Sequence, residues 1–428
     1  MTYEFIAIII TSLILLCAGM WIPFVISFAA FFIIFAKQGL TGLKAIGIVT
    51  WGSMNSFTLT AIPLFILMAE ILLRSGLATR LYKGLSHALR NLPGGLLQTN
   101  IIGCALFSAM SGSSVATAAA IGTVALPNLE ARGYSMRMSY GTLAAGGTLG
   151  ILIPPSIAMI IYGTFSETSI VRLFMAGVIP GVILTAFFVA FVMVVALLNP
   201  NLAPTATQDE KYSTRQIAAD ILPVTLLVIL VLGSLYLGLA TPTEAAAVGS
   251  IIAMLIARIW GNFNFEIIRG CFHKTVRVST AILFIVLGAF LFSYAVAITG
   301  VSRHLAQYVM DLELSKPVFI ITSAILYLVL GLFIESIAMM VITVPLMLPL
   351  LTHYGIDPIW FGVFLVILIE IGQITPPFGL NLFVIQSIRK GKLEEIIIGA
   401  LPYYILMVIF LILLYMIPSI ALWLPSLV

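Results

Sequence analysis

Two short segments of the chain combine a glycine with a Pro-Pro pair inside long apolar stretches. They read GILIPPS, residues 150–156, and GQITPPF, residues 372–378. Proline removes a backbone N–H donor and glycine allows close approach to the backbone, so each segment interrupts a helix and leaves carbonyl oxygens without partners. At membrane depth those oxygens need protein, water or a bound solute, and broken helices use them to coordinate Na⁺. We therefore interpret the two breaks as paired cation sites.

A single Pro-Pro break could be a simple kink, because transmembrane helices tolerate proline. The two breaks, however, belong to one repeated register, in which the same separation along the chain relates several pairs of residues. These pairs are Pro154 and Pro376, Pro155 and Pro377, Gly150 and Gly372, Gly133 and Gly355, and Pro127 and Pro349. Upstream, SGLATRL at 75–81 resembles TGVSRHL at 299–305, and the separation between these two segments is two positions longer than that of the pairs above. The sequence thus predicts two homologous halves, a recurrent plan in secondary transporters.

Each half also contains an apolar segment with a polar centre ahead of its break. Residues 104–127 hold a Ser-Gly-Ser-Ser core at 111–114. Residues 331–349 hold Glu335 and Ser336 at the positions of Ser113 and Ser114. Because short polar side chains compete with helical hydrogen bonds, such a core ends a helix. We predict two helix–break–helix hairpins that enter the membrane from opposite faces.

Acidic residues at membrane depth are costly and are commonly functional. Glu335 lies at the expected tip of the second hairpin and Glu370 lies just before the second break, so we interpret each as a cation ligand or a coupling group. Two other acids have structural explanations. Glu70 lies one turn before Arg74 and is expected to form an intrahelical ion pair, and Glu244 in TPTEAA is expected to cap a helix start.

The elements that must position these residues are membrane-spanning helices. The chain has 428 residues, of which 61% are hydrophobic and 8% are charged, whereas soluble proteins carry about 25% charged residues. Apolar runs long enough to span a bilayer recur, for example at 57–73, 221–240, 279–298 and 396–424. The alternating segments of a β-barrel are missing. The predicted fold class is an all-α polytopic membrane protein, and the opening segment 5–35 is expected to be retained.

The orientation of the halves follows from the number of spans between equivalent helices. Counted from the helix near 57–74, which is included, five spans precede its equivalent near 279–298, and a re-entrant hairpin adds none or two. An odd count predicts inverted-topology repeats. The positive-inside rule agrees, because fifteen of the twenty Lys and Arg residues then face the cytoplasm and the C-terminus faces out. The exceptions are Lys37, Lys44, Arg172, Arg303 and Lys316.

Four long motifs resemble the large membrane subunit of tripartite ATP-independent periplasmic (TRAP) transporters, the DctM-like family, over essentially the whole chain. They are SGSSVATAAAIGTVALP, GTLAAGGTLGILIPPS, LATPTEAAAVG and GQITPPFGLNLFV. The resemblance implies a multi-pass protein of the bacterial inner membrane that imports an organic acid, such as a C4-dicarboxylate or sialic acid, together with Na⁺. It also implies a small four-helix membrane subunit, a periplasmic substrate-binding protein and an elevator mechanism, with no enzymatic activity and no nucleic acid.

The resemblance also implies positions for the sites. Matching the family motif places one Na⁺ site at Ser111, Ser113, Gly150, Ile153 and Pro155. The internal symmetry then places a second Na⁺ site at Glu335, Ser336, Gly372, Thr375 and Pro377, with Glu370 as a possible coupling group. The candidates for contact with the substrate are Ser114 and Asn381, which lie near the breaks. The halves differ in that Thr375 offers a hydroxyl where Ile153 offers only its carbonyl.

These features predict how the chain divides into a scaffold and a transport domain. Residues 94–165 and 317–390 are expected to form the two halves of the transport domain, each with a hairpin and a broken helix. The expected scaffold comprises residues 1–93, with the first interfacial arm at 76–91; residues 166–278; residues 279–316, with the second arm at 300–314; and the C-terminal helix in 391–428.

Other functions fit the sequence less well. A channel needs a continuous polar lining, and an enzyme needs a catalytic set of side chains in reach of one another, whereas here polar groups cluster at two breaks. A stand-alone Na⁺-coupled carrier of carboxylates or other divalent anions would share the hairpins and inverted repeats. Only the motif resemblance separates that alternative from the tripartite system.

Overall fold

The computed structural model describes residues 15, 19–204, 212–377, 379–389 and 391–427, and every regular element in these ranges is helical. Phe378 of the second Pro-Pro motif lies outside the described residues, as do most of the opening segment and two of the basic residues expected to face the cytoplasm, Lys211 and Lys390. Six helices are long and apolar enough to cross a membrane. They are α10 (Ile170–Leu198), α11 (Thr214–Tyr236), α12 (Pro242–Trp260), α13 (Phe265–Thr299), α16 (Ser336–His353) and α19 (Leu393–Met416). The prediction of an all-α membrane protein is confirmed.

The same order of helices occurs twice along the chain. The first series is α5 (Leu77–Ala88), α6 (Leu96–Ser111), α7 (Ser114–Ala131), α8 (Met136–Thr148), α9 (Ile157–Ser166) and α10. The second series is α14 (Val301–Asp311), α15 (Lys316–Gly331), α16, α17 (Pro358–Gln373), α18 (Leu380–Ile388) and α19. Both α7 and α16 have 18 residues. The two homologous halves and both predicted arms, α5 and α14, are therefore present as helices.

The halves differ at the hairpin tips. Two residues, Gly112 and Ser113, join α6 to α7, whereas four residues, 332–335, join α15 to α16. The separation along the chain between equivalent residues of the two halves consequently changes at the tip. Before it, the last helical residue Ser111 corresponds to Gly331, and after it, Ser113 corresponds to Glu335. The second tip is longer by two residues, a difference that the register of prolines and glycines after the tip does not reveal.

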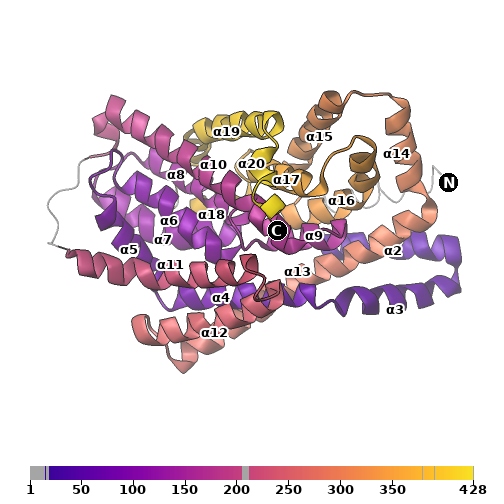
Figure 1. Cartoon of the computed structure of the whole chain (residues 1–428), viewed down its shortest axis with the longest axis horizontal. Coiled ribbons are helices and arrows are strands. Elements are labelled where there is room, and N and C mark those ends of the chain that lie inside the picture. The colour runs from indigo at the N-terminus through magenta and orange to yellow at the C-terminus, as the bar shows by residue number, and fades with distance from the viewer. Residues whose placement is uncertain (1–14, 16–18, 205–211, 378, 390, 428) are drawn as a thin grey trace.

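The hairpin of each half packs against the broken helix of the other half. Helix α7 contacts α18, and α16 contacts α9. Figure 1 shows this exchange, with α5 to α8 gathered near α18 on one side and α14 to α17 near α9 on the other. A two-fold relation between the halves would produce such an exchange. The two breaks therefore lie inside one packed unit rather than in separate halves.

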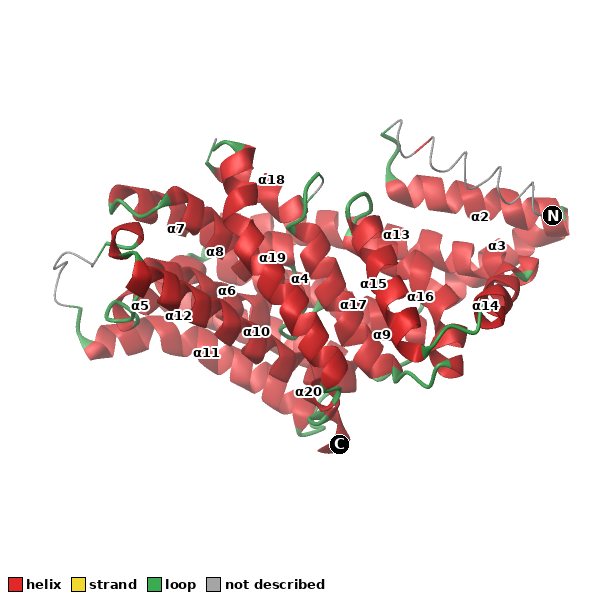
Figure 2. Cartoon of the chain, turned by 90° about the horizontal axis from the view of Figure 1, so that it is seen from above, coloured by secondary structure: helices red, strands yellow, loops and turns green. Residues whose placement is uncertain are grey.

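The remaining helices form a layer along that unit. Helix α4 (Ala61–Arg74) packs on α12 and α13, and α11 packs on the arm α5. Helix α2 (Ile22–Gln38) packs on α13 and on α3 (Leu40–Met54), and these three helices extend to one end of the molecule in Figure 2. The segments Leu40–Met54 and Thr58–Arg74 meet at a bend of 58°.

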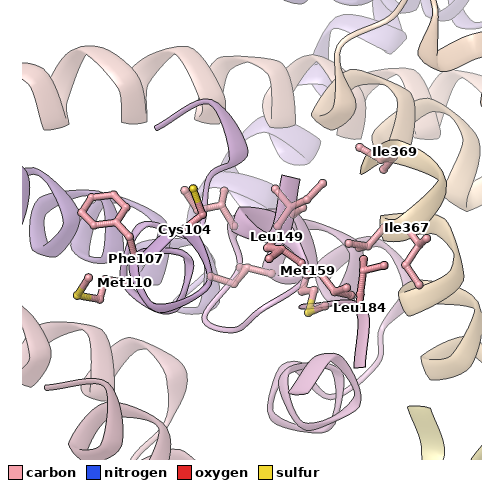
Figure 3. Packing of buried hydrophobic residues seen from close by; sticks show 14 of the residues in the cluster. Cys104, Phe107, Met110, Leu149, Met159, Leu184, Ile367 and Ile369 are labelled. Carbon is pink, nitrogen blue, oxygen red and sulfur yellow. The ribbon is translucent and has the colours of Figure 1, made fainter. Parts of the chain in front are cut away.

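Glycines allow α10 to hold the first break in position. A methyl group at Gly177 would lie 2.5 Å from the carbonyl oxygen of Leu152, and one at Gly181 would lie 2.7 Å from Cγ1 of Ile153. Buried side chains such as Leu149 of the break, Met159 of α9 and Leu184 of α10 belong to the same packed core (Figure 3). The broken backbone is therefore held by close packing on its apolar side.

The structural roles predicted for two acids are confirmed. Arg74 Nε lies 2.9 Å from Glu70 Oε2 within α4. At the start of α12, the backbone N–H of Thr241 donates to Glu244 Oε2 over 2.8 Å, and the N–H of Glu244 donates to Thr241 Oγ1 over 3.4 Å. This reciprocal arrangement is a capping box.

Candidate functional site

The tip of the first hairpin is a tight turn closed by hydroxyl groups. Gly112 takes a left-handed conformation, with φ of 58°, and the Ser113 hydroxyl accepts from the N–H of Ala116 to cap α7. The Ser113 carbonyl accepts from the backbone N–H of Thr117 over 3.0 Å and from Thr117 Oγ1 over 2.9 Å. The Ser111 hydroxyl lies 2.6 Å from Thr117 Oγ1. The hydroxyl oxygens of Ser111 and Thr117 and the carbonyl oxygen of Ser113 thus meet at this tip.

The first break lies directly against this tip. A 3₁₀ turn at Leu149–Ile151 ends the first half of the broken helix, and Ser156 caps α9. A methyl group at Gly150 would lie 2.6 Å from the Ser113 carbonyl oxygen, so only glycine fits there. The N–H of Ile157 donates to the Gly112 carbonyl over 3.3 Å.

Four of the five predicted residues of the first site lie at this contact. Pro155 follows a cis peptide bond, and its carbonyl would lie 2.8 Å from a methyl group at Gly112. The structure therefore brings Ser111, Ser113, Gly150 and Pro155 together. The fifth, Ile153, was predicted to contribute only its carbonyl, and its side chain packs on Gly181 of α10.

The tip of the second hairpin is capped by a carboxylate. Glu335 Oε2 accepts from the N–H groups of Ile337 and Ala338 over 3.0 and 3.2 Å, and Glu335 Oε1 accepts from the Ser336 hydroxyl over 2.7 Å. The Gln373 amide donates to Ser336 Oγ over 3.4 Å. The tip is thereby linked to the end of α17, immediately before the second break.

A cavity of about 240 Å³ separates the second tip from the second break. Its polar lining comes from Glu335, Ser336 and Gln373, beside Gly331 and Gly372. A methyl group at Gly372 would lie 3.2 Å from Gly331 Cα. Here the break faces the end of α15, whereas the first break faces the hairpin tip itself.

Two predicted residues of the second site lie away from this cavity. The Thr375 hydroxyl donates to the carbonyl of Ile371 over 2.6 Å, within its own turn. Pro377, which also follows a cis peptide bond, is exposed. Neither residue lines the cavity. The structure thus brings together Glu335, Ser336 and Gly372 but not the side chains of Thr375 and Pro377.

Several buried oxygens near the breaks have no hydrogen-bond partner in the described part of the chain. They are both carboxylate oxygens of Glu370, Oε1 of Gln373 and Oδ1 of Asn381. Glu370 is fully buried in α17. Burying an unpartnered carboxylate is strongly unfavourable unless a cation or a proton neutralises it. Glu370 therefore has the chemistry expected of a coupling group, although it does not line the 240 Å³ cavity.

The two candidate substrate residues touch each other across the halves. The amide of Asn381, in α18, donates to the hydroxyl of Ser114, at the start of α7, over 2.7 Å. The same amide lies 3.4 Å from the Ala144 carbonyl of α8. Both side chains are buried. Asn381 thereby ties the second broken helix to the tip of the first hairpin.

The two tips differ in electrostatic character. Hydroxyl groups, which are neutral, cap the N-terminus of α7, so the positive end of that helix dipole is left for an anion. The carboxylate of Glu335 caps α16 and gives that tip a negative charge. The N-terminus of α7 therefore favours a bound anion, whereas the C-terminal carbonyls of α6 at the same tip, and the carboxylate at the second tip, favour cations.

Two polar residues at the tips were missed by sequence reasoning. Thr117 lies one turn into α7 and interacts with Ser111, and its equivalent in the second half is Met339. Gln373 lies within the quoted motif, but its equivalent in the first half is Ile151. A search restricted to features shared by the two halves excludes both Thr117 and Gln373. A search for polar residues at helical spacing from the polar centres of the hairpins would have found Thr117.

Comparisons with known proteins agree on the family. The model of the tripartite ATP-independent periplasmic transporter DctM component matches residues 8–420. The C4-dicarboxylate TRAP transporter large permease protein DctM of Pseudomonas aeruginosa is 32% identical over 387 residues, which cover 90% of each chain. The sialic acid TRAP transporter large permease protein SiaM of Vibrio cholerae is 31% identical over 416 residues, which cover 96% of each chain.

The fold is also similar to a solved structure. The YdaH transporter of Alcanivorax borkumensis superposes with a TM-score of 0.63 at 17% identity, covering 90% of this chain and 89% of that chain. Its likeness supports the fold alone. Together with the family match and the apolar spans, these results establish that the chain is a multi-pass protein of the bacterial inner membrane and belongs to the DctM family, the large permease component of TRAP transporters.

Proposed function

We propose that this chain imports an organic acid by Na⁺-coupled secondary transport, as the transporting subunit of a tripartite system. The observation that carries the proposal is the crossed geometry of the breaks. Each hairpin packs on the broken helix of the other half, and the two tips differ in charge. A unit with a free helix N-terminus that favours an anion, and with carbonyl and carboxylate oxygens that favour cations, suits the transport of an anion together with a cation.

The oxygen donors at the tips fit Na⁺. Na⁺ is a hard cation that takes carbonyl, hydroxyl and carboxylate oxygens, as the chemistry of other hard cations shows. The first proposed site consists of Ser111, Ser113, Gly150 and Pro155, with Ile153 contributing only its backbone.

The second proposed site centres on Glu335, Ser336 and Gly372, around the cavity that also contains Gln373. Thr375 and Pro377 belong to it through the backbone of the break. Glu370, buried one turn before Gln373, is the proposed coupling group.

The proposed substrate is an organic anion that carries a carboxylate. Relatives of this chain are named for C4-dicarboxylate, sialic acid and 2,3-diketo-L-gulonate. Ser114 and Asn381 are the proposed contacts, because Ser114 begins α7, whose N-terminus favours a negative charge, and Asn381 of α18 contacts Ser114.

The proposed partners are a small four-helix membrane subunit and a periplasmic substrate-binding protein. The chain matches the large permease component of three-part systems, so both partners are expected as separate polypeptides. In addition to these two proteins, the lipid bilayer surrounds the permease.

The proposed mechanism is an elevator, in which a transport domain moves against a scaffold. The residue ranges expected for the transport domain, 94–165 and 317–390, contain both tips and both breaks. Helix α10 packs on α6, α9 and α17, and α19 packs on α8. We therefore include α10 and α19, which were expected in the scaffold, in the moving unit, and this leaves α2 to α5 and α11 to α14 as the scaffold.

Uptake of radiolabelled organic acids into proteoliposomes tests the proposal. The vesicles would hold the chain with its small subunit, with or without an inward Na⁺ gradient and a purified binding protein. Uptake that requires both supports the tripartite system. Uptake with Na⁺ alone would instead support a stand-alone carrier. Uptake that is indifferent to Na⁺ would contradict both cation sites.

A further inference from the structure

Glu370 is a buried acid whose charge nothing in the described chain balances. It lies in α17, one turn before Gln373, and none of its surface is exposed. Among the described residues, no N–H or O–H group donates to either carboxylate oxygen. A buried, ionised carboxylate is stable only when it is paired with a charge and receives hydrogen bonds. Glu370 therefore needs a neutralising partner that the side chains around it do not supply.

Glu370 is directed between two other helices of the proposed moving unit. A methyl group at Gly362 would lie 2.9 Å from Cδ2 of Leu173 in α10, and the indole N–H of Trp360 donates to the carbonyl of Leu414 in α19 over 3.2 Å. At about 100° per residue, Glu370 lies about 80° around the helix from each of these two contacts, midway between them. The carboxyl group therefore moves together with α10 and α19, inside the moving unit.

The titratable groups of the neighbouring helices do not balance this charge. Helix α17 packs on α8, α9, α10, α15, α16, α18, α19, α20 (Ser419–Leu422) and the 3₁₀ turn of the first break. Lys316 and Tyr162 bond to carbonyls at or before Pro358, about 18 Å from Glu370 along the helix axis. Within the described chain, no charged side chain lies close enough to Glu370 to alter its ionisation. The remaining titratable side chains of these elements also form no hydrogen bond with Glu370, and they are Arg137, Tyr140, Arg172, Tyr327, His353, Glu394, Glu395, Tyr403, Tyr404 and Tyr415.

The second half therefore holds two acids in opposite surroundings. The carboxylate of Glu335 accepts three hydrogen bonds, caps α16 and lines the 240 Å³ cavity. Glu370 accepts no hydrogen bond from the described residues and does not line that cavity. Two carboxyl groups in such different surroundings take different protonation states and different roles. Glu335 is suited to stay ionised and to bind a cation, whereas Glu370 is suited to be neutral.

The equivalent position in the first half holds a neutral side chain. Thr148 is also buried, and its hydroxyl donates to the Ala145 carbonyl over 2.7 Å, within its own turn. The fold thus accommodates a neutral residue at this point of a broken helix. The acid of the second half adds a titratable group that the fold does not require.

A proton fits this position better than Na⁺ does. A hard cation needs several oxygen ligands around it, whereas a proton needs only one oxygen. Among the helical neighbours of Glu370, Val366, Ile367 and Ile374 are apolar, and only Gln373 carries a side-chain oxygen. Gln373 also lines the 240 Å³ cavity, and its Oε1 has no partner in the described part of the chain. Because residues three apart are neighbours on a helix surface, Gln373 connects that cavity to Glu370.

We propose that Glu370 binds a proton whenever the transport unit is closed. The proton comes from hydronium in the 240 Å³ cavity by way of Gln373, and it returns to water when the tips open. The O–H bond of the carboxyl group is the only bond that forms and breaks. The neutral acid lets the closed unit move without an unbalanced charge, which is costly at membrane depth. This inference rests on the proposed import of an organic acid, and it adds a dependence on pH to that import.

Uptake at a series of pH values, with saturating Na⁺ and a fixed amount of loaded binding protein, tests the proposal in proteoliposomes. The wild-type rate should fall as the pH rises, by up to about tenfold per pH unit, which is the limit for one proton. Glu370→Gln keeps the shape of the protonated acid and cannot ionise, so its rate should not change with pH and its Na⁺ activation should remain. The control is Glu70→Gln, which removes a carboxylate from scaffold helix α4 and should keep the wild-type pH dependence.

Infrared difference spectroscopy of the purified full-length chain gives a readout that does not depend on transport. The carbonyl band of a protonated carboxyl group should be present at neutral pH, shift in D₂O, and disappear at alkaline pH and in Glu370→Gln. Glu370→Met, which is also neutral, covers the case in which the glutamine variant does not fold, and it should lack the same band.

The two readouts separate this proposal from the proposed function. A band that titrates in a chain that imports no acid would support the proton site and refute the import. Intact import with a wild-type rate that is indifferent to pH would overturn the proton site alone. Loss of Na⁺ activation in Glu370→Gln would also overturn it, because Glu370 would then be a Na⁺ ligand. A spectrum in which no band depends on Glu370 would overturn it as well.

Discussion

Replacing Gly150 with alanine should selectively damage the first Na⁺ site. The added methyl group would lie 2.6 Å from the Ser113 carbonyl oxygen and 2.8 Å from Ser114 Cα, and both of these atoms belong to the backbone. Ordinary contact begins at about 3.4 Å, so the tip and the break must separate by about 0.8 Å. Side chains cannot absorb that movement, because the clashing atoms are not in side chains.

The size of the effect follows from the cost of overpacking. Inserting a methyl group into a packed region costs about 1–3 kcal/mol. If the strain falls on the assembled tip and break, apparent Na⁺ affinity decreases by about 5- to 150-fold. The assay is the Na⁺ dependence of acid uptake into proteoliposomes, with Tm measured on the same preparation to separate a local effect from unfolding.

Two other glycines provide a graded comparison. A methyl group at Gly372 would lie 3.2 Å from Gly331 Cα, a contact that a shift of a few tenths of an ångström relieves. A methyl group at Gly233, in α11, would meet no atom within 4 Å. The expected order of effect is therefore Gly150→Ala, then Gly372→Ala, then Gly233→Ala with almost none. Unchanged Na⁺ activation and unchanged Tm in Gly150→Ala would refute the reasoning.

Three further predictions concern polar contacts. Ser336→Ala should weaken Na⁺ activation of uptake more than Thr375→Val, because Ser336 lines the second cavity and Thr375 bonds within its own turn; equal effects would contradict this geometry. Asn381→Ala should raise the KM for the acid by about 5- to 10-fold, the loss of one buried hydrogen bond, with Na⁺ activation retained in the same uptake assay. Asp220→Ala should lower Tm, because it leaves Arg80 without its 2.7 Å partner at a cost of about 2 kcal/mol or more. Glu130→Ala is the control, since its pair with Arg389 is half exposed and contributes under about 1 kcal/mol; similar Tm losses would mean that burial does not decide the strength of these pairs.

Features that depend on local sequence could be predicted. The helix breaks follow from proline and glycine, and the starts of α7 and α9 follow from the capping residues Ser113 and Ser156. The spans follow from length and hydropathy, and their repetition follows from the shared register of prolines and glycines in the two halves. These determinants act within a few residues of the chain, so a single sequence contains them.

Features that depend on how helices meet could not be predicted. Asn381 and Ser114 were both candidates, but nothing in the sequence indicates that they touch across 267 positions. The packing of α10 and α19 on the broken helices was also missed, because a helix that is apolar on all faces does not reveal which neighbour it contacts. Because the second tip is two residues longer, Gly372 contacts Gly331 at the end of α15 and not a residue of the tip itself.

The differences between the halves indicate where the chemistry lies. The features that both halves share, such as Gly150 and Gly372 and the Pro-Pro pairs, are those that a broken helix requires. The features that differ are charged or polar. Glu335 stands opposite Ser113, and Glu370 stands opposite Thr148, so the second half contributes both acids near the breaks while the first contributes only neutral groups. Carboxylates attract a cation over a longer range than carbonyls do. The proposed second site should therefore take up Na⁺ before the first. The bound Na⁺ would offset the negative charge of the acidic side chains, which otherwise opposes the entry of an acid.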